Sequence, residues 1–537
     1  MRPTLLQQAD ITAYLEAGHW TEDTQAGRYG EYARNHPDAI ACQDDTGSLT
    51  WAELHVATER LAANLIELGL ARDARALVQM PTSNREMGLR IAFKKAGIIG
   101  AFVPMQWRRK ELDYVVRRIA PDLAVMASED AGVLDAVIDV VHRVNLLETG
   151  GEGWRSWRKL IDGQPSAAAL DSLAERAFRF DEVSLITASS GTSGLAKLCE
   201  WPEAAQLCVG RGIAGRLKIT ADDNVGIYSP MSGAAGVLVW AVSGSVPCRF
   251  TFPGTYHADA LLDLAEAERI SVITTVPVIL ARLARADLDA RDLGALRVLR
   301  TGTAAADVRA ARSFEAGSGC RVVVASGSME CPGFGHAHMD EPRDLRLDGS
   351  VGLPLPGCRL RIEDDAGRTL PAGEIGELKV TAPFAASGYW RDAEATAVAW
   401  TDGWYATGDV GSLDEDGRLT LKGRLKEVIN RSGHKILPLE VEHEISGHPD
   451  VFDCAIVGAP DAEYGQVPWA FVQMMAGAEL DAASIRAALK AKGLASYKLP
   501  VRIIAVDELP RISGNKVDKK SLLDMAPAAD TQRRDTP

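Results

Sequence analysis

The fold is decided by Val183–Ala188 (VSLITA) and by the segment that follows it at once, Ser189–Lys197 (SSGTSGLAK). The first six residues are mainly apolar or β-branched, and such a short run is typical of a strand buried on both faces of a parallel sheet. The nine residues after it carry four hydroxyl groups, two glycines and a lysine. We therefore expect a buried strand that ends in a polar loop.

This loop has the composition of a polyphosphate site. Glycines let the backbone approach an anion closely, hydroxyl and backbone N–H groups donate hydrogen bonds, and the lysine supplies positive charge. The loop does not match the GxxxxGK[ST] pattern of a Walker loop. The alternative is a flexible Ser/Gly linker, but a linker seldom lies between a buried strand and an amphipathic continuation. The expected phosphate contacts are Ser189, Ser190, Gly191, Thr192, Ser193, Gly194 and Lys197.

On both sides of this stretch, short apolar runs alternate with amphipathic segments. The alternation predicts an α/β fold with mostly parallel sheets. The expected helices include Trp51–Leu68 and Ala258–Arg269. The other expected buried strands are Ala76–Met80, Leu123–Ala127, Val272–Thr275, Leu296–Leu299 and Val322–Val324.

The pattern changes after Gly376, where short β runs and turn signals such as Asp414–Gly417 (DEDG) indicate a β subdomain. Beyond residue 426 the sequence predicts a second, smaller α/β unit. Its expected helices are Glu440–Ile445 and Ala483–Lys490, and its expected strands are Cys454–Val457 and Ala470–Met474. We predict a large N-terminal domain over residues 1–425, a small mobile C-terminal domain over residues 426–525 and a disordered tail over residues 526–537.

The composition is that of an ordinary globular protein, with 46% hydrophobic and 25% charged residues. The net charge of -14 argues against a nucleic-acid or anionic-membrane partner, because both require a positive field. The eight cysteines form no CxxC pair, so neither a disulfide framework nor a zinc site is expected. The first residues lack the apolar core of a signal peptide, and no apolar run reaches membrane-spanning length. These features favour a cytoplasmic protein without a membrane partner.

The loop is the first of several motifs that resemble those of the adenylate-forming superfamily. This superfamily contains acyl- and aryl-CoA ligases, peptide-synthetase adenylation domains and luciferases. The loop is similar to the family's TSGTTGxPKG, with Ala196 in place of proline and Leu198 in place of the last glycine. Thr301–Ala305 (TGTAA) looks like the adenine-binding GGAP turn, and this likeness places Gly302, Thr303 and Ala304 against the nucleotide.

The later motifs follow in family order, so that the resemblance covers nearly the whole chain. Tyr405–Asp409 (YATGD) is similar to YxTGD, and Gly423–Glu427 (GRLKE) is similar to GRxKE. Ser432–Lys435 (SGHK) is similar to the loop that approaches the thiol and the phosphate after the small domain rotates. Pro510–Lys516 (PRISGNK) resembles the PxxxxGK terminus, with Asn515 in place of the usual glycine.

The resemblance implies an enzyme that uses ATP, Mg²⁺ and coenzyme A in two steps. A carboxylate attacks the α-phosphorus of ATP and expels pyrophosphate, and a thiol then takes the acyl group from the adenylate. Lys516 corresponds to the family's catalytic lysine, which stabilises charge on phosphate oxygens. Glu330 corresponds to the Mg²⁺ ligand. Asp409 and Arg424 correspond to the ribose contacts.

The second step is implied to use a different face of the small domain. Lys426 takes the hinge position about which that domain rotates. After rotation, the expected groups on the thiol side are Ser432, Gly433 and His434, with Lys435 as a further catalytic candidate.

The chain departs from the family in the segment aligned with YGMTE, where Ser326, Gly327, Ser328 and Met329 are the expected nucleotide contacts. The family's adenine-stacking aromatic residue is Ser326 here, and its phosphate-binding threonine is Met329, which cannot donate a hydrogen bond. A neutral hydrogen bond contributes about 0.5–1.5 kcal/mol, so its loss could slow adenylation by about tenfold. One alternative is therefore an enzyme that performs only thioesterification, on an acyl-adenylate made by a partner adenylating ligase.

The acid pocket also departs from the family. Ser229–Gly236 (SPMSGAAG) aligns with a segment that usually carries an aromatic residue or histidine. Small side chains leave room for a larger ligand, which predicts a bulky cyclic or polycyclic carboxylic acid. The alternative is that neighbouring helices fill the space. The expected pocket residues are Ser232, Gly233, Ala234, Ala235 and Gly236.

The acceptor and the assembly state stay open. Two weaker likenesses, Ala17–Trp20 (AGHW) and Pro104–Arg108 (PMQWR), favour the branch that acts on cyclic and aryl acids and makes CoA esters. A carrier-protein phosphopantetheine is the alternative acceptor. A non-catalytic binding protein is a third class, against which the retained catalytic motifs argue. The sequence neither requires nor excludes a homodimer.

Overall fold

The computed structural model describes residues 3–148, 151–189, 196–302, 308–512 and 516–525, with only the backbone described for Ile512 and Lys516. The chain forms two compact units. Unit 1 comprises Met1–Leu360 and Val380–Tyr405, and unit 2 comprises Arg361–Lys379 and Ala406–Pro537.

Unit 1 contains two large sheets, of which the first has eight strands. Its inner strands are parallel, and only the end pairs β14–β15 and β1–β2 are antiparallel. The strands in spatial order are β15 (Gly335–His336), β14 (Arg321–Ser326), β13 (Val298–Gly302), β12 (Val272–Thr275), β10 (Asn224–Tyr228), β11 (Arg249–Thr251), β1 (Ile40–Asp44) and β2 (Gly47–Thr50).

The second sheet of unit 1 has seven strands and is also parallel, except that its last two strands, β8 and β9, are antiparallel. Its strands in spatial order are β7 (Trp154–Ser156), β6 (His142–Asn145), β5 (Leu123–Met126), β3 (Arg75–Gln79), β4 (Ile99–Phe102), β8 (Val183–Ser189) and β9 (Lys197–Pro202). The predicted fold class, with mostly parallel sheets in the large part of the chain, is confirmed.

The ends of several helices coincide with residues that cap the backbone or adopt a left-handed conformation. Helix α3 (Trp51–Glu67) starts at Thr50, whose hydroxyl accepts a hydrogen bond from the backbone N–H of Glu53 while the Glu53 carboxylate accepts from the Thr50 N–H. Helix α4 (Asn84–Ala96) ends at Gly97, which has a φ of 69°. A Cβ there would lie 2.3 Å from the carbonyl oxygen of Arg176, so only glycine fits this close approach.

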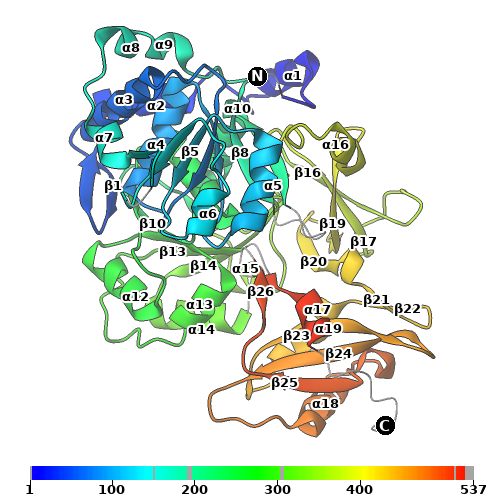
Figure 1. Ribbon diagram of the computed structural model, residues 1–537. Helices are drawn as coiled ribbons and strands as arrows, with labels where there is room; N and C mark the ends of the chain where they lie inside the picture. The colour runs from blue at the N-terminus through cyan, green and yellow to red at the C-terminus, as the bar shows by residue number, and fades with distance from the viewer. Residues whose placement is uncertain (1–2, 149–150, 190–195, 303–307, 513–515, 526–537) are drawn as a thin grey trace. The chain divides into compact units, whose positions relative to one another are not determined.

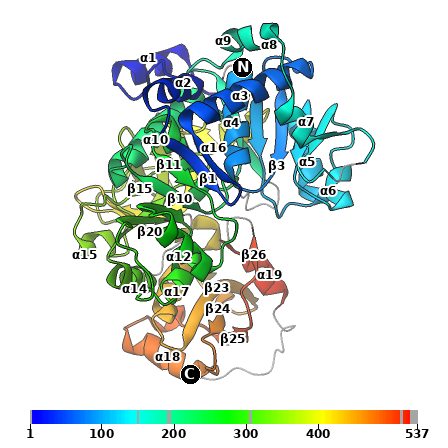
Figure 2. The same cartoon turned by 90° about the vertical axis from the view of Figure 1, so that its left-hand side faces the viewer.

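One face of the eight-stranded sheet is covered by α12 (Ala258–Ala267), α13 (Pro277–Leu283) and α14 (Val308–Ser318), which lie together in Figure 1, and Figure 2 shows α12 beside α14. Leu261, Leu280 and Phe314 of these helices pack on Ile273 and Leu299 of the sheet. Because a parallel sheet needs cover on its faces, this layer leaves the carboxyl ends of the strands as the place for polar loops.

Unit 2 is built mainly from antiparallel strands. A five-stranded sheet, most of whose residues belong to unit 2, has the order β16 (Arg359–Glu363), β17 (Gly376–Thr381), β19 (Trp404–Leu413) and β18 (Trp400–Thr401), with β20 (Leu419–Arg424) also paired to β19. Another has the order β22 (His434–Ile436), β21 (Ile429–Arg431), β24 (Gly465–Met474) and β23 (Val451–Asp461), and β25 (Arg502–Val506) joins β24 in parallel. Its helices are α17 (Pro438–Ser446), α18 (Ala482–Ala491) and α19 (Lys519–Asp524).

Most predicted elements are found within one or two residues of their expected ends, but two expectations are corrected. The strand expected at Leu296–Leu299 is β13, at Val298–Gly302, because pairing with β12 begins at Val298 and continues through Arg300. The segment after the Ser/Gly loop is strand β9, which pairs antiparallel with β8. The tail over residues 526–537, for which disorder is expected, lies outside the described residues.

No helix in the described part of the chain combines the length and the apolar character needed to cross a membrane. All eight cysteines are buried and unpaired, as expected from their spacing.

Candidate active site

The polar loop joins the ends of two paired strands. Ser189 ends β8 and lies opposite Lys197, the first residue of β9. Ser189 is buried, with 8% of its surface exposed. The other predicted contacts of this loop, Ser190, Gly191, Thr192, Ser193 and Gly194, lie outside the described residues. The pairing therefore places the two ends of the predicted phosphate loop side by side at the edge of a sheet.

Lys197 lies in a chain of polar contacts that also contains Glu330. The ammonium group of Lys197 lies 3.5 Å from the hydroxyl of Tyr389 and 4.7 Å from the centre of its ring. The same hydroxyl donates a hydrogen bond of 3.1 Å to Oε1 of Glu330. The Glu330 side chain, expected as a metal ligand, is thus connected through the Tyr389 hydroxyl to Lys197, the last residue of the predicted phosphate loop.

Tyr389 was not among the residues predicted from the sequence. It is 2% exposed, its backbone N–H donates to the hydroxyl of Thr396, and its ring lies 5.1 Å from that of Trp400. Burial raises the pKa of its hydroxyl, and the neighbouring Glu330 carboxylate raises it further, so that Tyr389 keeps its proton and donates a hydrogen bond to Glu330. The only local signal was an aromatic pair, Tyr389 and Trp390, after Gly388.

Glu330 follows the carboxyl end of β14. Within that segment, the backbone N–H of Cys331 donates to the hydroxyl of Ser328, and Met329 is buried. Gly327 fits tightly, since a Cβ there would lie 2.6 Å from the backbone nitrogen of Gly333. Ser326 is the last residue of β14 and is partly exposed. These contacts give the Ser326–Glu330 turn a defined shape.

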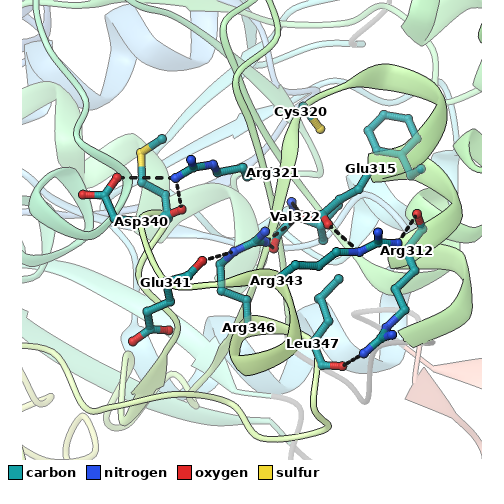
Figure 3. A network of polar contacts seen from close by, with 12 residues as sticks. Arg312, Glu315, Cys320, Arg321, Val322, Asp340, Glu341, Arg343, Arg346 and Leu347 are labelled. Atoms are coloured by element: carbon teal, nitrogen blue, oxygen red, sulfur yellow. Dashed lines mark hydrogen bonds and ion pairs between the residues drawn. The ribbon is translucent and has the colours of Figure 1, made fainter.

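The opposite end of β14 is anchored by a network of polar contacts (Figure 3). Oε1 of Glu315, on α14, accepts hydrogen bonds from the backbone N–H of Val322, at 2.7 Å, and from Arg346, at 2.6 Å. Arg346 belongs to the short helix α15 (Arg343–Arg346) and also donates to the carbonyl groups of Val322 and Glu341. The network fixes β14 at its start, which helps to hold the turn at its end.

The predicted adenine turn begins at the end of β13. A Cβ on Gly302 would lie 2.2 Å from the carbonyl oxygen of Ala325, so the close approach of β13 and β14 requires glycine. Thr303 and Ala304, also expected to contact the nucleotide, lie outside the described residues.

The predicted acid segment lies at the start of helix α11 (Ala234–Trp240). The backbone N–H of Met231 donates a hydrogen bond of 2.8 Å to the hydroxyl oxygen of Thr82, and the carbonyl oxygen of Met231 accepts one from the buried Arg90. Ser232, Gly233 and Ala234 are half-buried, whereas Ala235 and Gly236 are buried.

At Gly236, the absence of a side chain is explained by local packing and not by a ligand. A Cβ there would lie 2.4 Å from the carbonyl oxygen of Pro230, so packing of the segment already requires glycine. Space for a ligand is therefore better sought beside the half-buried Gly233 and Ala234.

In unit 2, the two residues expected to contact the ribose, Asp409 and Arg424, form an ion pair with each other. Asp409 and Arg424 are partners in the register of β19 and β20, and Nε of Arg424 lies 2.7 Å from Oδ1 of Asp409. The side chain of Asp409 is 10% exposed and that of Arg424 is 32% exposed. The carbonyl of Thr407 accepts a further hydrogen bond from Arg424. This geometry presents a fixed carboxylate next to a cation.

The predicted hinge residue Lys426 lies in a single 3-10 turn, η2 (Leu425–Glu427). Partial burial lowers the pKa of Lys426, and the nearby cations Arg424 and Lys519 lower it further. The next residue, Glu427, forms an ion pair of 2.7 Å with Lys519, which also lies 2.7 Å from Glu442. Lys519 of α19 thus connects the η2 turn, through Glu427, with α17, through Glu442.

Of the predicted thiol-side residues, Ser432 and Gly433 form the turn between β21 and β22, and His434 and Lys435 begin β22. Ser432 and Gly433 have φ values of 49° and 88°, and the N–H of Gly433 donates to the side chain of Asn430. The ring of His434 stacks on Tyr497 at 4.6 Å. Lys435 forms an exposed ion pair of 3.1 Å with Asp365.

Lys516, the predicted catalytic lysine, is described for its backbone only. It lies in β27 (Lys516–Val517), opposite Ile512 of β26 (Arg511–Ile512).

The described residues contain no cluster of three or more His, Cys, Asp or Glu side chains that could hold a metal ion. Mg²⁺ commonly binds one or two carboxylates together with substrate phosphates, so a site with Glu330 as its protein ligand is compatible with this ion.

Comparison with known proteins adds independent findings. A model of the AMP-binding enzyme family matches residues 30–390, and a model of the AMP-binding enzyme C-terminal domain matches residues 440–516. The matches therefore reach into both compact units.

Individual relatives cover almost the full length. A 2-hydroxy-7-methoxy-5-methyl-1-naphthoate–CoA ligase from Streptomyces carzinostaticus is 30% identical over 96% of this chain and 95% of its own. An indoleacetate–CoA ligase from Aromatoleum aromaticum is 30% identical over 91% of this chain and 95% of its own. The structure of the amide bond synthetase McbA from Marinactinospora thermotolerans, 26% identical, superposes with a TM-score of 0.83 over 94% of this chain and 99% of its own.

Proposed function

The chain belongs to the AMP-binding enzyme family, and from that premise we propose that it activates a bulky cyclic or polycyclic carboxylic acid and transfers the acyl group to coenzyme A. It is an ATP-dependent, adenylate-forming enzyme of the acid–thiol ligase class. The size of the acid and the residue roles below are the parts that we propose.

The observation that carries the proposal is the buried contact of Glu330, Tyr389 and Lys197 at the end of strand β8. A cation and a carboxylate are held a short distance apart beside a loop rich in hydroxyl groups and glycine. Such a site suits a polyphosphate with its counter-ion, because preorganised charges stabilise the charge that develops on phosphate oxygens.

The proposed first step uses the groups of this chain as follows. Ser189, Lys197 and the loop between them bind the β- and γ-phosphates, and Asp409 with Arg424 binds the ribose hydroxyls. Glu330 holds Mg²⁺, which when bound neutralises phosphate charge. Tyr389 donates to Glu330 and keeps its carboxylate oriented. Lys516 stabilises the α-phosphate as the substrate carboxylate attacks and pyrophosphate leaves.

The proposed second step follows rotation of residues 426–525 about Lys426. The turn Ser432–Lys435 then approaches the adenylate, and the thiolate of coenzyme A attacks the acyl carbon while AMP leaves. Two conformations that use one site for two reactions are a known way to combine incompatible geometries.

The proposed bulk of the acid is testable at Ala234, which is half-buried at the first turn of α11. Ala234→Phe should raise KM for a polycyclic acid such as 1-naphthoate by at least about tenfold, and should affect acetate much less. The matched control is Ala52→Phe, at a half-buried position in the first turn of α3. Equal turnover of 1-naphthoate in the Ala234→Phe protein would contradict the assignment of the pocket.

The two half-reactions are separated by one experiment. The protein receives either an acid, ATP, Mg²⁺ and coenzyme A, or a synthetic acyl-adenylate with coenzyme A, and pyrophosphate, acyl-AMP and acyl-CoA are followed by mass spectrometry. We expect acyl-CoA from both mixtures, and Lys516→Ala should abolish pyrophosphate release while transfer from the adenylate continues.

Product from the adenylate alone would instead support the thioesterification-only enzyme with a partner ligase. Transfer to a phosphopantetheinyl carrier protein, in preference to coenzyme A, would support the carrier-loading alternative.

A further inference from the structure

Strand β13 carries a buried cation in the middle of the eight-stranded sheet. Arg300 is 4% exposed, and its register partner in β12 is Thr274, which is fully buried. Arg300 is the central residue of β13 and lies two residues before Gly302, which ends the strand at the edge where ligands of parallel sheets commonly bind.

The described partners of Arg300 are all neutral. Nη1 donates to the hydroxyl of Thr274, and Nε donates to Nε2 of His336, each at 3.3 Å. His336 cannot balance the charge, because burial and the neighbouring arginine lower its pKa to about 3. Its Nδ1 lies 2.8 Å from the carbonyl oxygen of Ala337, which fits the neutral tautomer protonated at Nδ1.

Other deeply buried cations of unit 1 differ in this respect. Arg90, Lys94 and Arg346 each have a carboxylate within 2.7 Å, namely Glu86, Glu203 and Glu315. None of the described ion pairs contains Arg300, and burial alone lowers its pKa, to about 10. A buried charge without a counter-charge is costly, and proteins commonly keep such a group where a ligand supplies the missing charge.

A short chain of contacts leads from Arg300 to the acid segment. The hydroxyl of Thr274, which accepts from Arg300, donates to the carbonyl oxygen of Ala235 at 3.3 Å. Ala235 lies in the first turn of α11, next to the half-buried Gly233 and Ala234. The unpaired cation and the small residues of this segment are therefore neighbours in unit 1.

We propose that Arg300 binds a second anionic group of the acid substrate, a carboxylate carried on the ring system in addition to the one that is activated. This inference rests on the proposed function, and it narrows the acid from bulky and cyclic to bulky, cyclic and dianionic. Thr274 and His336 hold the guanidinium in place without neutralising it, so that the ligand provides the only counter-charge. A neutral acid of equal size leaves this cation unpaired and binds less well.

The test compares naphthalene and benzene dicarboxylates with their monomethyl esters, which have similar shape but one charge less. Pyrophosphate release gives kcat/KM for each acid, and the shift of Tm on adding the acid without ATP gives a binding readout. The variants are Arg300→Met, which removes the charge at similar volume, and Arg300→Lys, which keeps it. Arg346→Met is the matched control, because it removes a buried arginine that has a carboxylate partner.

We expect wild type to prefer at least one dicarboxylate over its monoester by about tenfold or more in kcat/KM. Arg300→Met should reduce this ratio to about one, Arg300→Lys should retain part of it, and Arg346→Met should leave it unchanged. The Tm of the free protein should rise or stay equal in Arg300→Met and fall in Arg346→Met, since only the latter breaks a buried ion pair.

The proposal is overturned if wild type prefers no dicarboxylate, if the preference survives in Arg300→Met, or if Arg300→Met loses Tm as Arg346→Met does. Failure of the ligase function looks different, because then no acid yields pyrophosphate. In that case a Tm shift by a dicarboxylate that disappears in Arg300→Met would still support the anion site.

Discussion

The groups of unit 1 that we propose for adenylation and the groups of unit 2 that we propose for the thiol step are held in contrasting ways. Glu330 and Tyr389 are 6% and 2% exposed, and they contact each other and Lys197 across segments distant in the chain. The side chains of Lys435 and Asp365 are 66% and 89% exposed, and only one ion pair joins them. One region is a buried network, and the other is a surface turn.

This difference in burial matches the different requirements of the two proposed reaction steps. Phosphate chemistry benefits from charges that are fixed before the reaction, because no reorganisation is then required in the transition state. A turn that approaches the adenylate only after a rotation gains little from deep burial. Its surface ion pair contributes about 0–1 kcal/mol, so it can be broken at small cost.

The largest difference between the two half-reactions is expected when the buried carboxylate of Glu330 loses its charge. Glu330→Gln keeps the shape of the side chain but removes its charge, and we expect kcat for pyrophosphate release to fall by about 10²–10³-fold. Transfer from a preformed adenylate to coenzyme A should change by less than about threefold, because Glu330 acts on the phosphate step. Equal losses in both steps, measured by stopped assays, would show that the two regions do not act separately.

The second largest effect is expected at the ribose pair. Asp409→Asn removes the charge that faces Arg424 and one acceptor for a ribose hydroxyl. Hydrogen bonds to charged groups contribute about 1.5–3 kcal/mol, so KM for ATP should rise by about 10–100-fold. A change in Tm without any change in KM for ATP would instead assign this pair to stability.

A smaller effect is expected at Tyr389, whose hydroxyl contacts both Lys197 and Glu330. Tyr389→Phe removes one hydroxyl, and we expect about a tenfold loss of adenylation together with a higher Mg²⁺ concentration for half-maximal rate. Titration of Mn²⁺ by electron paramagnetic resonance, with a non-hydrolysable ATP analogue, measures ion binding without turnover.

The control for this variant is Tyr29→Phe, because the buried hydroxyl of Tyr29 contacts Ser243 instead. We expect that variant to lose stability without any change in metal dependence. The same Mn²⁺ affinity in wild type and Tyr389→Phe would contradict the positioning role.

The smallest effect is expected at the exposed ion pair of Lys435 and Asp365 in unit 2. Asp365→Ala breaks the ion pair with Lys435, and the free energy of unfolding in urea should change by less than about 0.5 kcal/mol. The rate of transfer from the adenylate should stay within about twofold of wild type, or rise at low salt as Lys435 is released. A destabilisation above about 1 kcal/mol would show that this pair is structural.

The strands were predictable where burial and composition agree. Val272–Thr275 was predicted with the bounds that β12 has, because four β-branched residues form an uninterrupted run. The neighbouring β13 was predicted to begin two residues and to end three residues too early, because its bounds depend on pairing with β12 and β14 and not on an apolar run alone. Arg300 lies in the part of the strand that the prediction left out.

The site was predictable as a set of motifs but not as a set of contacts. Ser189, Lys197, Glu330, Asp409 and Arg424 were all named from local patterns. Tyr389 was not, because a single tyrosine in a loop has no distinguishing pattern.

The sequence by itself determined the alternation of strands and helices, the polar loop after β8 and the class of enzyme. These features depend on the period of apolar residues and on short motifs, which are local properties. Only the tertiary structure decided that Tyr389 contacts Glu330 and Lys197, which are 59 and 192 positions away, and that Arg300 has no carboxylate partner among the described residues. Contacts between distant residues follow from strand register and packing, and the cost of a buried charge depends on every group around it.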